Sequence, residues 1–500
     1  MKKLSLWLTA LAIAITITGC TKTRTKSAQQ QPAPVMKMPV TTASEEAREQ
    51  FMSGMHATDM GRFVDACGYF EKAVQKDTAF AFAYLALANA SNSLKEFTTN
   101  LRKAEEAANG ASREEQLLIE ITRKGFDNDI EGQLAAAKAL VELAPESPRT
   151  WLALAGVQSG LNQNTEARQS IARAIEIAPS MAAAHMQAGN SYLFGEPKDL
   201  NQAEQHIRKA IELAPNESGP YDILGDVYRA QGKLEKARDA YTEAGRYSGA
   251  DGSPFQQRGH VNSFLGNYKA ARADYDKSIV MARANEAPNF GIYKAYVNVY
   301  AGDPSAAIGE LKALASKIDK MDIPEPIGLK ILALGSAINI ALHQRMINEA
   351  ETLIADWSVL MRAWSKQVGT DGFRRGQEAG IAYIEGMLAV KKGKFDAAEE
   401  KAKTIVKLLK PDANPRKMEP VHALRGAIAL EQGRYAEAAE HFRQGNYEND
   451  VYIKYLLAKS LEGAGQTDEA MKLYQEVATY NFNDVGFALT RKEAMMKAGL

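Results

Sequence analysis

A short pattern that returns at a nearly fixed interval constrains this 500-residue chain more than any other feature. Pro145 and Pro179 lie 34 residues apart and end similar segments, Val-Glu-Leu-Ala-Pro and Ile-Glu-Ile-Ala-Pro. A third copy ends at Pro215, 36 residues further on. Self-similarity at a period of about 20 to 50 residues is typical of repeat architectures. We therefore expect a series of similar units rather than one large hydrophobic core.

The clearest unit combines bulky and small residues at fixed spacings. Apolar residues three and four positions apart mark one face of a helix, a small residue lets a second helix approach closely, and the proline stops each unit. The unit reads Tyr221-x2-Leu224-Gly225-x2-Tyr228, then Ala237-x3-Tyr241-x2-Ala244. This pattern resembles the tetratricopeptide repeat. The resemblance implies an all-α solenoid of helical hairpins, stacked into a right-handed superhelix.

Weaker copies extend the pattern to about twelve hairpins. We expect an N-terminal part of the array at 45–316 and a C-terminal part at 377–500, which ends in an amphipathic capping helix from Asp484. The period fails between them, at 317–376, where a helix over about 346–368 is longer than a repeat helix. This stretch is interpreted as an irregular helical joint, either rigid or a hinge. Its Trp357 and Trp364 are either an exposed aromatic anchor or part of the core.

The N-terminus differs from the rest of the chain. Two lysines precede an apolar run of about 15 residues, which is short for a membrane-spanning helix, so residues 1–19 are interpreted as a secretion signal. The run ends in Ile-Thr-Gly-Cys, which resembles the bacterial lipobox and implies lipidation of Cys20 after cleavage. Residues 20–44 are rich in Thr, Lys, Gln, Pro and Ala and predict a flexible tether. About 24 such residues would span on the order of 25–30 Å.

Signatures of catalysis are absent from the sequence. The seven histidines show no HExxH or other metal-ligand spacing, and no phosphate-binding glycine loop or nucleophile elbow is present. Lys plus Arg and Asp plus Glu both number 61, so the composition argues against binding to nucleic-acid phosphates. We therefore predict no enzymatic activity, no cofactor, no metal site and no nucleic-acid partner.

The family resemblance implies that partners bind in the concave groove, which is lined mainly by the first helix of each hairpin. Acidic residues in this groove would favour a ligand that carries Lys, Arg or a backbone amide, and would disfavour the acidic chaperone tails that some relatives bind. The alternative is that these polar residues only solvate an unused wall. The inward residues implied by the family register are Met186, Asn190, Leu193, Asp222, Asp226, Arg229, Gln256, His260 and Ser263.

These features favour a lipid-anchored interaction scaffold of the bacterial cell envelope, with envelope proteins or peptides as partners. Thr21 after the lipidated cysteine fits placement in an outer membrane, facing the periplasm. The alternative is an accessory component of a secretion, pilus or polysaccharide-export machine that binds carbohydrate or a small ligand. That alternative predicts aromatic clusters on the concave wall, and the inward residues named above contain none.

Overall fold

The computed structural model describes residues 36–91, 94–127, 129–249, 251–282, 286–323, 326–412, 414 and 416–500. The predicted signal segment, Cys20 and the first part of the predicted tether lie outside these residues. The chain divides into two compact units between Pro254 and Phe255. We call them the N-terminal unit and the C-terminal unit.

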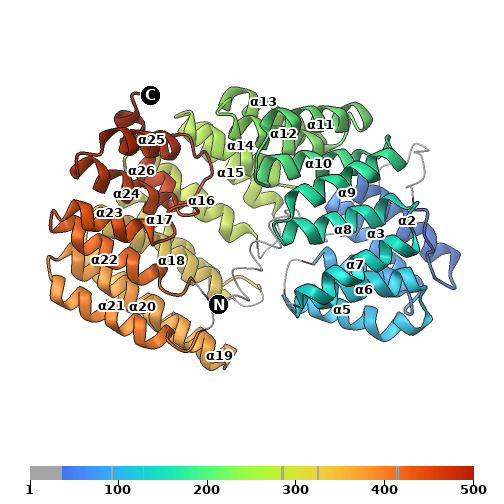
Figure 1. Ribbon diagram of the computed structural model, residues 1–500, viewed down its shortest axis with the longest axis horizontal. Coiled ribbons are helices and arrows are strands. Elements are labelled where there is room, and N and C mark those ends of the chain that lie inside the picture. The colour runs from blue at the N-terminus through green and yellow to red at the C-terminus, as the bar shows by residue number, and fades with distance from the viewer. Residues whose placement is uncertain are drawn as a thin grey trace. The chain divides into compact units, whose positions relative to one another are not determined.

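The described residues form twelve successive helical hairpins and one final helix, with no strand among them (Figure 1). This confirms the predicted all-α solenoid and its number of hairpins. The first six are α2 (Glu45–Asp59) with α3 (Phe63–Lys76), α4 (Ala81–Asn89) with α5 (Leu94–Ala107), α6 (Arg113–Phe126) with α7 (Ile130–Leu143), α8 (Pro148–Gly160) with α9 (Asn164–Ile177), α10 (Ala182–Phe194) with α11 (Leu200–Leu213), and α12 (Ser218–Ala230) with α13 (Leu234–Tyr247). A short 3-10 turn, η1 (Ala108–Gly110), precedes α6.

The remaining hairpins continue the same alternation. They are α14 (Ser253–Phe264) with α15 (Tyr268–Met281), α16 (Ala287–Tyr300) with α17 (Pro304–Ile318), α18 (Pro326–His343) with α19 (Ile347–Val368), α20 (Asp371–Lys391) with α21 (Phe395–Leu409), α22 (Glu419–Glu431) with α23 (Tyr435–Arg443), and α24 (Val451–Gly463) with α25 (Thr467–Ala478). The chain ends in α26 (Val485–Ala498). Consecutive first helices also touch, as α10 does α12 and α20 does α22. The first helices of each unit therefore share one face, which we call its inner face.

Close contact within a hairpin depends on the small residue of the repeat. A Cβ added at Gly225 of α12 would lie 2.4 Å from Cε1 of Tyr241 in α13. Tyr241 is fully buried there. The turn between the two helices also needs glycine, because Gly232 has φ +72°, in the left-handed region. The sequence spacing of Gly225 and Tyr241 thus corresponds to one packing contact.

The stretch predicted to be an irregular joint contains α18, α19 and the start of α20, which are the three longest helices among the described residues. Trp357 is 8% exposed, and its indole N–H donates to the Ile331 carbonyl at 3.1 Å. Trp364 packs edge-on against Phe373 at 5.0 Å. These contacts place Trp357 in the core, whereas Trp364 is half-buried. Helix α18 also has the length and apolar composition of a membrane-crossing helix, and it packs between α17 and α19.

Residues 36–44 lie against the N-terminal unit, although the sequence predicts a flexible tether there. Met36 is 8% exposed and belongs to the core around α2 to α4. Its carbonyl accepts a hydrogen bond from the Ser147 hydroxyl at 2.7 Å. The tether interpretation missed this because Met36, Met38 and Val40 stand among prolines and polar residues. A short extended segment carries no helical periodicity to reveal its packing.

The first hairpin of the N-terminal unit contacts hairpins far along the array. Helix α2 touches α10, and the Gly61 Cα lies close to the backbone of Gly219 at the start of α12. Arg149 of α8 donates to Asp59 of α2 at 2.5 Å, and both side chains are almost fully shielded from solvent. Arg62 pairs with Glu217 at 3.0 Å. These contacts join the beginning of the unit to its last three hairpins.

Helix α26 closes the C-terminal unit in another way. It packs on α25, as a capping helix should, and also contacts α16, α18 and α24 (Figure 1). All three are first helices, so α26 lies against the inner face. Its Phe487 and Thr490 are fully buried. The predicted capping helix is confirmed as a helix, and it also covers part of the inner face of its own unit.

Candidate partner-binding site

The inner-face residues predicted from the sequence fall into both units. The N-terminal unit contains Met186, Asn190, Leu193, Arg229 and the two aspartates Asp222 and Asp226, which we call the acidic pair. The C-terminal unit contains Gln256, His260 and Ser263. Met186 and Leu193 are buried, so they contribute apolar packing rather than free polar groups. Asn190 is half-buried on α10.

Asp226 is held by two donors on the inner side of α12 and α13. Arg229 donates to its Oδ1 at 2.6 Å, and the Tyr241 hydroxyl donates to the same oxygen at 2.7 Å. Arg229 is only 4% exposed. Burial raises the pKa of Tyr241 well above its usual range, which keeps its hydroxyl proton in place for donation. Tyr241 is thus part of the site, although the sequence indicated it only as a packing residue.

Asp222, one helical turn before Asp226, has a different environment. Its Oδ1 is buried and has no hydrogen-bond partner among the described residues. Burial raises the pKa of Asp222 well above its usual range, and the negative charges of Asp226 and Asp251 raise it further. A buried acceptor without a donor costs free energy, so a ligand that supplies an N–H or a cation at this position is favoured.

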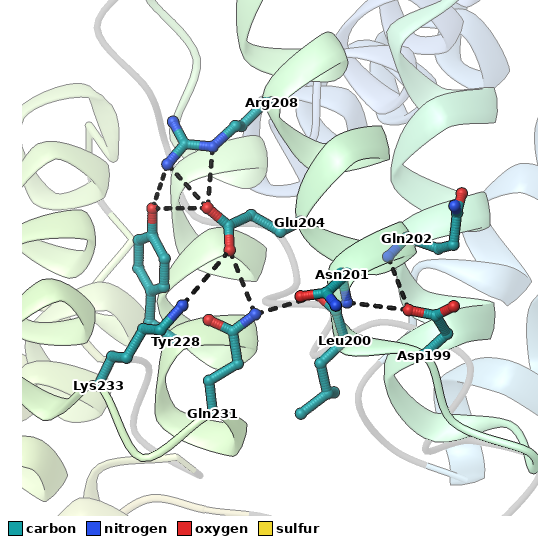
Figure 2. Close-up of polar contacts among 9 residues, drawn as sticks. All are labelled: Asp199, Leu200, Asn201, Gln202, Glu204, Arg208, Tyr228, Gln231 and Lys233. Atoms are coloured by element: carbon teal, nitrogen blue, oxygen red, sulfur yellow. Dashed lines mark hydrogen bonds and ion pairs between the residues drawn. The ribbon is translucent and has the colours of Figure 1, made fainter.

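A polar network on α11 fixes α12, which carries both carboxylates. Figure 2 shows Glu204 of α11 at its centre, where it accepts hydrogen bonds from Arg208 at 2.8 Å and from the Tyr228 hydroxyl at 3.2 Å. Gln231 bridges the two helices by donating to Glu204 and to the Leu200 carbonyl, each at 3.2 Å. Burial opposes the charge of Glu204, but these donors lower its pKa overall. The network therefore favours an ionised Glu204 and a fixed orientation of α12 on α11.

The corresponding residues of the C-terminal unit are covered by its own chain. His260 is 4% exposed, and its Nδ1 lies 2.6 Å from the Tyr275 hydroxyl and 2.8 Å from Nδ2 of Asn483. Gln256 lies 3.0 Å from the other ring nitrogen of His260. Asn483 belongs to the segment that leads into α26. Gln256 and His260 are therefore engaged within the unit, unlike Asp222.

Histidines pair at the same place in two hairpins. Nδ1 of His185 lies 3.5 Å from Nδ1 of His206, and Nδ1 of His422 lies 3.2 Å from Nδ1 of His441. The described residues contain no group of three or more His, Cys, Asp or Glu side chains arranged to hold a metal ion.

A cavity of about 410 Å³ adjoins the His422 and His441 pair and is lined by Glu399, Arg425, Ile428, Arg434, Glu437 and His441. Its charged side chains pair with one another, as Arg425 does with Glu399 and Arg434 with Glu437.

Family models for the tetratricopeptide repeat match residues 148–181, 254–285, 383–451 and 453–481. The matched segments lie in both units. This is a tetratricopeptide repeat protein. Arrays of this repeat are protein-interaction scaffolds, and the described hairpins form such an array. No curated protein matches the sequence.

Several solved structures are similar to parts of the array. A tetratricopeptide repeat protein from Thermus thermophilus, TTC0263, is 18% identical over 37% of this chain and 98% of its own, with a TM-score of 0.32. Pseudomonas aeruginosa PilF is 18% identical over 41% of this chain and 91% of its own, with a TM-score of 0.33. A repeat protein from Parabacteroides merdae covers 58% of this chain and 99% of its own at 13% identity and a TM-score of 0.33.

Proposed function

We propose that the protein is a lipid-anchored interaction scaffold of the bacterial cell envelope, and that it binds a basic or amide-bearing segment of a partner protein at Asp222 and Asp226. The proposal is carried by one observation, the buried Oδ1 of Asp222 that has no donor among the described residues. A Lys or Arg side chain would supply the donor and a positive charge between two carboxylates.

The raised pKa of Asp222 gives this site a thermodynamic signature. A cation beside the carboxyl stabilises its ionised form, so binding lowers the pKa of Asp222 and releases a proton wherever the carboxyl is protonated in the free protein. A neutral partner segment would leave the protonated form in place. Proton release on binding therefore distinguishes a cationic ligand from a purely apolar one.

The test is crosslinking in intact cells, followed by recovery of the protein and identification of its partners. We compare the native chain with a variant carrying Asp222→Asn and Asp226→Asn, which keeps the side-chain shapes and removes both charges. Asp239→Asn, on the exposed side of α13, is the matched control. We expect a partner that the native chain and the control recover and the double variant loses. Equal recovery from all three would show that the acidic pair does not bind.

The proposed anchor is Cys20, followed by a tether that is shorter than the sequence predicts. Because Met36 is held by Ser147, only residues 21–35 would separate the lipid from the folded unit. A flexible chain of this length, as the composition predicts, would span about 20 Å. We expect a palmitate analogue to label the native chain and a Cys67→Ala variant, and not a Cys20→Ala variant. The Cys20→Ala variant should leave the membrane fraction, and its retention there would contradict the anchor.

A further inference from the structure

Residues 36–42 run along one edge of the N-terminal unit and contact three hairpins in turn. The Thr42 hydroxyl donates to Asp77, which precedes α4, at 2.5 Å. The Thr41 N–H donates to Oε1 of Glu115, in the first turn of α6, at 2.8 Å. The Met36 carbonyl accepts from Ser147, at the start of α8. The segment therefore crosses the N-terminal ends of α4, α6 and α8.

The side chains of this segment alternate between the protein and solvent. Met36 is buried and Met38 and Val40 are half-buried against the core, whereas Lys37 and Pro39 are exposed. A period of two is the pattern of an extended peptide that lies on an apolar surface. Backbone contacts at both ends fix its register. The segment is thus bound as a peptide ligand would be, in a shallow apolar track with polar groups at each end.

The polar groups of the track are buried parts of the repeat array. Glu115 is fully buried, and its Oε2 accepts the Ser112 N–H in the capping box of α6, which leaves Oε1 for the peptide. Ser147 is also fully buried. An empty track would leave Oε1 of Glu115 and the Ser147 hydroxyl without these partners. The track therefore requires a ligand whose N–H donor and carbonyl acceptor are as far apart as the Thr41 N–H and the Met36 carbonyl.

We propose that this track is a binding site for an extended peptide, which the chain's own residues 36–42 fill, and that a partner segment with apolar side chains at three alternate positions displaces them. The site is separate from Asp222 and Asp226, and its contacts lie at α4, α6 and α8 rather than on α12. Displacement would also release seven residues to the tether and so lengthen the reach of the anchor. Partner binding at the track and distance from the membrane would then be linked.

The test supplies the segment in trans. Met36→Asp, Met38→Asp and Val40→Asp together should expel the segment from the track without shortening the chain, because three carboxylates cannot be buried there. A fluorescent peptide of residues 34–44 should then bind this variant at least tenfold more tightly than it binds the native chain. The same peptide with the three aspartates should not bind. Ser147→Ala added to the variant should weaken binding several-fold, whereas Asp222→Asn with Asp226→Asn should leave it unchanged.

A second measurement needs no disruptive variant. Excess peptide with Ile or Phe at the three alternate positions is added to the native chain, and hydrogen exchange is followed at the Thr41 N–H. We expect exchange to accelerate with that peptide and not with its Asp-substituted form. Binding of the aspartate peptide as tightly as the native peptide, or unchanged exchange at Thr41 at saturating peptide, would overturn the proposal. Neither result would bear on the acidic pair, so the two sites are tested separately.

Discussion

In the N-terminal unit, a buried ion pair between Asp59 and Arg149 joins the first hairpin to α8. In the C-terminal unit, Phe487 of α26 is enclosed by Phe264, Tyr300 and Tyr480, with ring centroids 5.2 to 6.5 Å apart. Distant helices of the repeat are thus joined by an ion pair in the N-terminal unit and by aromatic packing in the C-terminal unit. We call these contacts the polar closure and the aromatic closure. In the N-terminal unit, Oδ1 of Asp222 has no hydrogen-bond partner among the described residues. In the C-terminal unit, Asn483, which precedes α26, lies within hydrogen-bond distance of His260.

The two kinds of contact should respond differently to salt and to a charged ligand. Apolar packing at Phe487 depends on the area removed from water and is not weakened by ionic screening. An ion pair is strong only while both charges stay desolvated, and it weakens when water or salt reaches it. We therefore expect a charged ligand to perturb the Asp59–Arg149 contact more than the packing of Phe487.

Removing the aromatic closure should have the largest effect. Phe487→Ala deletes a fully buried ring, and such changes cost about 3–5 kcal/mol. We expect faster hydrogen exchange in α16, α24 and α26, and unchanged exchange in the N-terminal unit. Met496→Ala, on the same helix at a side chain that is 68% exposed, should have almost no effect. Unchanged exchange in α16 would show that α26 does not stabilise the inner face.

The sequence predicted the repeat because each of its contacts is local. Gly225 and Tyr241 are 16 residues apart, and the prolines stand two residues after α7, α9 and α11. The capping helix was predicted for the same reason. Helical periodicity and a terminal capping residue are readable without knowledge of the rest of the fold.

The contacts that close each unit could not be predicted, because they join residues far apart in the chain. Asn483 meets His260 across 223 residues, and Ser147 meets Met36 across 111. No periodicity relates such positions. The candidate site was predicted only in part, since the family register indicated Asp222 and Asp226 but not the role of Tyr241. The division between Pro254 and Phe255 also lies in a stretch where the repeat pattern continues without interruption.

Breaking the polar closure should have a smaller effect, confined to the other unit. Arg149→Met leaves the Asp59 carboxylate desolvated without a cation, which costs about 3 kcal/mol. A double variant with Asp59→Asn should recover most of that loss. Arg173→Met removes an exposed ion pair with Glu176 and should cost at most about 1 kcal/mol. Denaturant unfolding with hydrogen exchange checks this, and equal losses in the single and double variants would contradict it.

The smallest expected effect is a dependence of the C-terminal unit on pH, with two contributions of opposite sign. Burial raises the pKa of Asp484, the N-cap of α26, from 3.8 to about 6. The folded state therefore binds this proton first, and acidification from pH 6 to pH 4 stabilises the unit. Burial lowers the pKa of His343 from 6.5 to about 4. The unfolded state binds that proton first, so acidification from pH 6.5 to pH 4 destabilises the unit.

Since these two contributions have opposite signs, together they should add little net pH dependence to the stability of the native chain between pH 4 and 6.5. Asp484→Asn keeps the cap and removes the acid-stabilising contribution, so this variant should lose about 1–2 kcal/mol on acidification. His343→Gln should instead gain a similar amount over the same range. Denaturant midpoints at pH 4, 5 and 6.5 measure both slopes. Parallel slopes in the two variants would show that the stability of the C-terminal unit does not depend on the protonation of Asp484 or His343. The contrast between the two units would then rest on packing alone.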